Sequence, residues 1–126
     1  VGASMLDVDS MQFYLKMLGE LMQAFQAVGN DTSCDWFRYL ITRYEPGDLP
    51  QKKILNFLHS IMTERILTAA QLKSTAIADA SMSKQTLYEV DRGDFIAGTY
   101  DRAMESVNAV NSEIEKLILR TWGRSV

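Results

Sequence analysis

The first part of the chain carries hydrophobic residues at helical spacing. From about residue 7 to residue 28 they recur every three or four positions, which is typical of an amphipathic helix. Asp9 or Ser10 is expected to cap its start, because a short side-chain oxygen can accept an unpaired backbone N–H there. The Gly29-Asn30 pair is expected to end it, since both residues tolerate a left-handed conformation.

The longest hydrophobic repeat lies near the other end of the chain and predicts a helix from Thr99 to about Trp122. At 1.5 Å per residue this helix would be roughly 36 Å long. Thr99 is a suitable N-cap for it, and Gly123 is a suitable stop. The apolar positions that define the repeat are Tyr100, Met104, Val107, Val110, Ile114, Leu117, Ile118 and Trp122.

Between these two helices the pattern changes to short apolar runs separated by turns. Residues 36–44 are aromatic and β-branched and precede Pro46 and Gly47, which predicts a strand and then a loop. Pro50 suits the first turn of a helix, whose apolar stripe continues to Met62. Residues 65–68 are a second short strand candidate. This alternation of helices and strands predicts an α/β layer fold, mostly helical, with about two short strands.

Two short helices are predicted at 73–80 and 84–90, followed by a turn at 91–94. With the Ser83-Lys84-Gln85-Thr86 stretch opening the second helix, this region is similar to a helix-turn-helix that reads bases in DNA. The spacing opposes that interpretation, because Ser81 then occupies the turn position that usually holds glycine. The alternatives are a small helical DNA-binding or regulatory module at 75–90 and two short helices that only pack on a core.

Composition limits the class of protein. The 126 residues suffice for about one small domain, and 47% hydrophobic with 23% charged residues is ordinary for a globular chain. The formal net charge of -3 does not favour nucleic acid, so contact with DNA would need a local basic patch. The single cysteine, Cys34, excludes an intramolecular disulfide. No apolar run approaches the ~20 residues of a bilayer span, so we expect a cytoplasmic protein without a membrane partner.

The sequence contains none of the common self-sufficient active-site motifs. It lacks a glycine-rich phosphate loop, a C-x-x-C pair and an H-E-x-x-H pair. His59 is the only histidine, which excludes a histidine metal cluster. The loop at residues 42–48 follows the predicted strand, and ligands bind at such places in open α/β sheets. Arg43 and Tyr44 could stack on a base there, although an ordinary turn explains the same residues.

Several blocks of the chain carry a family resemblance. They are Met5-Leu6-Asp7-Val8, Arg38 to Asp48, Lys73 to Ala80, Ser83 to Val90, Thr99 to Glu105, Asn108 to Asn111 and Trp122 to Arg124. Together they resemble the ParA-type plasmid partition ATPases, and most closely the RepA branch of repABC replicons. Residues 60–65 and 94–98 follow the family pattern only loosely.

The resemblance implies the C-terminal half of such a protein, as part of a P-loop-type three-layer α/β fold. The family's phosphate-binding loop, magnesium ligands and catalytic lysine belong to the N-terminal half, so no catalytic residue is assigned here. The intact family protein uses ATP and Mg, and neither is expected to bind this chain alone. Further implied properties are dimerisation, weak non-specific binding to nucleoid DNA and a ParB-type partner protein in DNA segregation.

The resemblance also assigns site residues by position. Thr42, Arg43 and Tyr44 would lie near the adenine of the nucleotide. Lys73 would be the basic residue that contacts DNA, and Lys84 is a second candidate for that role. A phosphate contact needs only a positive side chain in a groove, so Lys73 can serve without reading bases.

The chain starts at Val1 rather than at a methionine. This is compatible with processing, with a piece of a longer protein, or with a remnant at residues 1–4 before a native start at Met5. Half of a domain would expose apolar surface. The missing N-terminal half, or self-association through the long C-terminal helix, would cover that surface.

Overall fold

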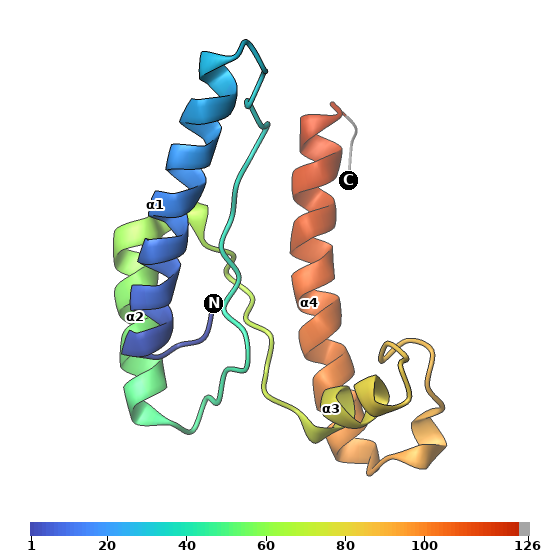
Figure 1. Cartoon of the computed structure of the whole chain (residues 1–126). Coiled ribbons are helices and arrows are strands. Elements are labelled where there is room, and N and C mark those ends of the chain that lie inside the picture. The colour runs from blue at the N-terminus through green and yellow to red at the C-terminus, as the bar shows by residue number, and fades with distance from the viewer. Residues whose placement is uncertain (124–126) are drawn as a thin grey trace.

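The computed structural model describes residues 1–123, so Arg124, the last residue of the family resemblance, lies outside the described residues. The elements in chain order are α1 (Met5–Ala27), α2 (Leu49–Met62), the 3-10 helix η1 (Thr63–Arg65), α3 (Thr75–Met82), the 3-10 helix η2 (Arg92–Asp94) and α4 (Ala97–Thr121). Figure 1 shows α1 and α2 on one side of the extended chain segments and α4 on the other. Among residues 1–123 no helix is both long and apolar enough to span a membrane.

The long first and last helices are confirmed, but their predicted N-caps are wrong. Ser4, not Asp9 or Ser10, caps α1, and its hydroxyl oxygen accepts the Asp7 N–H at 3.1 Å. The N-cap of α4 is Ile96, not Thr99, and its side chain makes no capping hydrogen bond. The predicted ends are confirmed, because Gly29 (φ 87°) and Gly123 (φ 69°) adopt the left-handed conformation just after the helices.

The helix predicted to begin near Pro50 is confirmed as α2. Proline occupies its first turn, where the missing N–H costs no hydrogen bond. Asp48 caps this helix by accepting the Gln51 N–H at 3.2 Å. The cap fixes the end of the loop that follows residue 44.

The predicted α/β fold class is wrong for this chain, because residues 1–123 contain no strand. The segments predicted as strands, 36–44 and 65–68, form only isolated parallel bridges, and Arg65 belongs to η1. These bridges pair Gly2 with Thr42, Tyr39 with Ile66, and Tyr44 with Leu72. The protein is mostly helical, and the bridges connect three non-helical segments, which lie before α1, between α1 and α2, and after η1.

Two local features explain why these segments form no regular ladder. Arg43 has φ 52°, and this left-handed residue interrupts the extended backbone next to Thr42. The register also shifts by one residue between the two bridges. Ile66 lies 27 positions after its bridge partner Tyr39, whereas Leu72 lies 28 positions after its bridge partner Tyr44. Such a shift removes backbone groups from the ladder, as a β-bulge does.

A carboxylate from α4 binds the backbone N–H groups that this shift leaves without ladder partners. The Glu113 carboxylate accepts the Thr68 N–H at 2.8 Å and the Ala69 N–H at 3.2 Å. It also accepts a hydrogen bond from the Thr68 hydroxyl. Glu113 therefore supplies the hydrogen-bond acceptors that these backbone N–H groups lack at the point where the register changes.

Ser106, two turns earlier on α4, holds the same segment a few residues further on. Its buried hydroxyl oxygen accepts the Leu72 N–H at 2.8 Å and donates to the Ala70 carbonyl at 3.1 Å. Since residues seven apart share one face of a helix, one face of α4 binds the whole segment from 68 to 72. Lys73 follows directly, so α4 also fixes where the candidate site begins.

Hydrophobic packing divides into two clusters. The first lies between α1, α2 and the extended segments, and its buried members are Ala3, Val8, Ile41, Tyr44, Leu58 and Ile66. The second lies between α3, η2 and α4, and its buried members are Ala76, Leu87 and Ala103. α3 is therefore held mainly by α4, and the lower part of Figure 1 shows the two in contact.

The prediction of a second short helix at 84–90 is wrong, and the helix-turn-helix interpretation is therefore wrong as well. Residues 83–90 form turns, and Lys84 has φ 55°, which ends the helical path after α3. The Glu89 carboxylate accepts the Thr86 N–H at 2.9 Å and closes one of these turns. Without a second helix, this region has no recognition helix to enter a groove.

Replacing Ser106 with alanine should destabilise the chain by roughly 1–3 kcal/mol, because the partly buried Leu72 N–H and Ala70 carbonyl lose their partner. Ser112 lies on the same helix but is exposed, so Ser112→Ala serves as the matched control. The measurement is the free energy of unfolding in urea. Equal stability of the two variants would contradict the role given to Ser106.

Candidate functional site

A cleft lies where the N-terminal segment and α1 meet the end of the extended segment 39–44. It has a volume of about 240 Å³. Its polar lining includes Ser4, Asp7, Thr42, Arg43, Gln51 and Lys73. The structure thus brings together three of the five residues that the sequence singled out, from segments about 30 residues apart.

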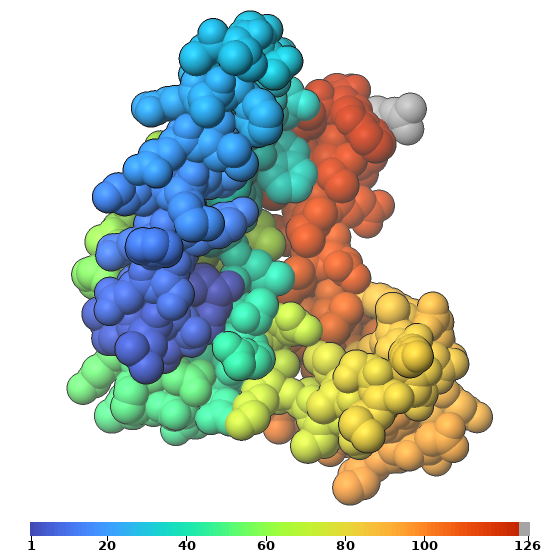
Figure 2. Space-filling model, viewed as in Figure 1, coloured from blue at the N-terminus to red at the C-terminus, as the bar shows by residue number. Residues whose placement is uncertain are grey.

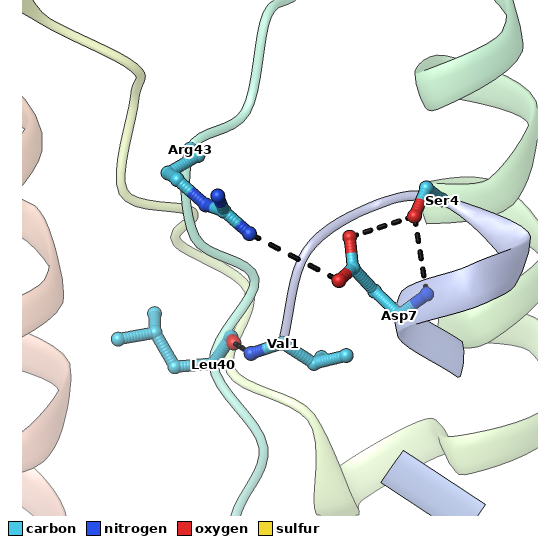
Figure 3. Close-up of polar contacts among 5 residues, drawn as sticks. All are labelled: Val1, Ser4, Asp7, Leu40 and Arg43. Carbon is cyan, nitrogen blue, oxygen red and sulfur yellow. Dashed lines mark hydrogen bonds and ion pairs between the residues drawn. The ribbon is translucent and has the colours of Figure 1, made fainter. Parts of the chain in front are cut away.

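The N-terminal residues place a carboxylate opposite Arg43 in this cleft (Figure 3). The Arg43 guanidinium lies 3.9 Å from the Asp7 carboxylate, which also accepts the Ser4 hydroxyl at 2.7 Å. The Val1 nitrogen donates to the Leu40 carbonyl at 2.6 Å. Burial lowers the pKa of this α-amino group, while the Asp7 charge opposes the shift. Residues 1–4 are therefore an integral part of the fold around the cleft.

Lys73 lies at the junction of this cleft with two others. Its ammonium is 3.0 Å from the Glu45 carboxylate, and both side chains are largely exposed. A second cleft of about 210 Å³ contains Lys73 and Arg102, and a third of about 550 Å³ contains Lys73 and Arg43. Arg43 and Arg102 thus each share a cleft with Lys73. The third cleft is mainly apolar, with Leu72 and Ile77 in its wall.

The second cleft has the chemistry of an anion site. Its lining combines the cations Lys73 and Arg102 with three hydroxyl residues, Ser74, Thr75 and Thr99, and contains no carboxylate among the described residues. α3 starts here, where Ser74 accepts the Ala76 N–H at 3.2 Å. Positive charge, hydroxyl donors and a nearby helix start all favour a phosphate or a similar anion.

Tyr44 and Lys84 lie differently from the other predicted residues. Tyr44 is 8% exposed and belongs to the first hydrophobic cluster, so its ring packs in the core and only Thr42 and Arg43 line the cleft. Lys84 follows the last turn of α3, whereas Lys73 precedes its first turn. The two lysines are therefore separated by the length of this helix.

Arg102 and a second basic group were not predicted from the sequence. Arg102 lies in the second turn of α4, and only the tertiary structure brings it beside Lys73. Arg38, Lys116 and Arg120 line another cleft of about 480 Å³, together with Glu64 and Glu113. The i, i+4 spacing of Lys116 and Arg120 on a long helix was the available signal. Within residues 1–123, no group of three or more His, Cys, Asp or Glu side chains could hold a metal ion.

Comparison with known proteins gives two close relatives. No family model matches the chain. It is 48% identical over 122 residues to a Sinorhizobium fredii protein named "Putative replication protein A", and 48% identical over 124 residues to a Rhizobium rhizogenes protein of the same name. These matches cover 97% and 98% of this chain but only 30% and 31% of the relatives.

The chain is therefore similar, over nearly its whole length, to part of a longer rhizobial protein named for replication. This agrees with the broader part of the expected resemblance, that to proteins of bacterial replicons. Neither name refers to partition or to an ATPase.

Proposed function

We propose that this chain is the DNA-contacting part of a longer replication and partition protein of a bacterial replicon, with Lys73 as its central phosphate contact. The observation that carries the proposal is the junction of clefts where Lys73 meets Arg43 and Arg102. The relatives named for replication support a role on DNA.

The physical basis is charge placed beside hydroxyl donors. Phosphate oxygens of DNA bind cationic side chains and hydroxyls without regard to sequence, which suits the cleft of Lys73 and Arg102. The ion pair between Lys73 and Glu45 is exposed and contributes little, so a DNA phosphate can replace it. The net charge of -3 repels DNA from the rest of the surface, which keeps binding weak and salt-sensitive.

A nucleotide role for the neighbouring cleft is a second part of the proposal. Thr42 and Arg43 line this cleft and would contact the adenine base in the intact protein. Tyr44 would act from the core by fixing the position of these two residues. ATP phosphates and Mg would be bound by other parts of the longer protein, which would dimerise and act in DNA segregation with a ParB-type partner.

Replacing Lys73 with alanine should weaken binding to a random-sequence DNA duplex and lower the slope of log affinity against log salt by about one. Fluorescence anisotropy across a salt series measures both quantities. Arg102→Ala should have a similar effect, and Lys84→Ala a smaller one.

Lys53→Ala is the matched control, because Lys53 is an exposed lysine on α2 that lines none of the three clefts around Lys73. If Lys53→Ala weakened DNA binding as much as Lys73→Ala, the binding would be explained by general electrostatic attraction and not by the clefts around Lys73. Sequence-selective binding would contradict the proposed mode of contact.

This chain alone should not bind ATP measurably, because we propose that the ATP phosphates and Mg are bound by other parts of the longer protein. Calorimetric titration of ATP with Mg tests this expectation, and DNA affinity should be the same with and without the nucleotide. Saturable binding of ATP by this chain would contradict the proposal.

A further inference from the structure

A separate basic cleft lies beside the C-terminal half of α4, away from the clefts around Lys73. It has a volume of about 480 Å³ and is called here the Arg38 cleft. Lys116 and Arg120 line it from α4, and Arg38 lines it from the segment before α2. Figure 2 shows these two parts of the chain next to each other in the upper part of the molecule. Arg102 and Arg120 are about 27 Å apart along α4, so the two basic sites are distinct.

The three cations of the Arg38 cleft have no anionic partner within residues 1–123. None of the ion pairs in this part of the chain involves Arg38, Lys116 or Arg120. Arg38 is half-buried, and its Nη1 donates to the Phe37 carbonyl at 2.9 Å, which leaves further guanidinium donors available. Lys116 and Arg120 lie one helical turn apart, where like charges repel each other. The cleft therefore favours a ligand with negative charge.

The rest of the lining limits the kind of anion. Ile66, Leu67 and Leu117 form an apolar wall, and the first two are buried. Glu64 is exposed in the cleft and can accept hydrogen bonds. The Glu113 carboxylate already binds the backbone N–H groups described above. A matching ligand therefore combines negative charge with an apolar group and hydrogen-bond donors.

The backbone at the edge of the same cleft is strained. Thr63 lines the cleft and has φ 49° and ψ -109°, a conformation that is rare for a β-branched residue. Its hydroxyl donates to the Met62 carbonyl at 2.8 Å. Residues in such conformations concentrate at ligand-binding sites, where the surrounding structure holds them. This observation does not depend on charge, and it points to the same place.

We propose that the Arg38 cleft binds an acidic peptide segment of a partner protein, in which carboxylate side chains flank an apolar residue. The carboxylates pair with Arg38, Lys116 and Arg120, whose guanidinium and ammonium groups form charge-assisted hydrogen bonds. The apolar side chain of the peptide packs against the apolar wall, and a peptide N–H donates to Glu64.

Other anions match the Arg38 cleft less well. A DNA backbone has no apolar side chain to cover the wall and no N–H donor for Glu64, whose charge repels phosphates. Inorganic phosphate also leaves the apolar wall unused. The inference does not depend on the DNA contact proposed for Lys73.

Fluorescence anisotropy with a short labelled peptide, in which glutamates flank one leucine, tests the proposal. We expect saturable binding that weakens at least about tenfold when Lys116→Gln and Arg120→Gln are combined, because charge-assisted contacts are lost. Lys52→Gln combined with Lys53→Gln is the matched control, since these lysines are exposed on α2 outside the cleft, and it should change the affinity less than about twofold. Circular dichroism should show the same helix content in both double variants, because all four side chains are exposed.

Two further measurements separate this site from general electrostatic attraction and from the DNA contact. Replacing the leucine of the peptide with serine should weaken binding by about tenfold, because the apolar wall loses its contact. Lys73→Ala, which weakens binding to DNA, should leave binding of the peptide unchanged. Absence of saturable peptide binding, equal binding of the leucine and serine peptides, wild-type affinity in the Lys116 and Arg120 double variant, or displacement of the peptide by a random-sequence DNA duplex or by inorganic phosphate would each overturn the proposal.

Discussion

The structure depends on the contact between one face of α4 and the extended segment 66–72. This segment shifts register by one residue against its neighbour, so the Thr68 and Ala69 N–H groups need partners outside the ladder. Glu113 provides them, and Ser106 binds the backbone two turns away. All of these hydrogen bonds join α4 to the backbone of the segment, so these two side chains determine where α4 lies.

The position of the candidate site follows from that contact. Lys73 is the residue directly after the segment that α4 holds, and its N–H donates to the Tyr44 carbonyl at 3.0 Å. Arg102 lies one turn before Ser106 on the same helix, so the docking of α4 brings it to Lys73. Arg43, which has a left-handed backbone conformation, lines two of the clefts that Lys73 lines. Three residues distant in sequence therefore meet because one helix docks in one place.

Local patterns predicted the helices well and the strands poorly. The apolar repeats of α1, α2 and α4, with Pro50, Gly29 and Gly123, depend on neighbouring residues and were readable. The absence of strands depends on Arg43 and on the one-residue shift near Thr68, which no local pattern reveals. Thr42, Arg43 and Lys73 could be chosen from the resemblance, whereas the burial of Tyr44 and the nearness of Arg102 are tertiary.

Amide hydrogen exchange at Thr68, Ala69 and Leu72 tests the role of α4 most directly. If Glu113 and Ser106 hold the segment, these three amides exchange slowly in the wild-type chain. Thr68 and Ala69 should then lose protection in a Glu113→Ala variant, while Leu72 keeps most of its own. Exchange of all three amides at the rate of an unstructured peptide in the wild-type chain would contradict the account.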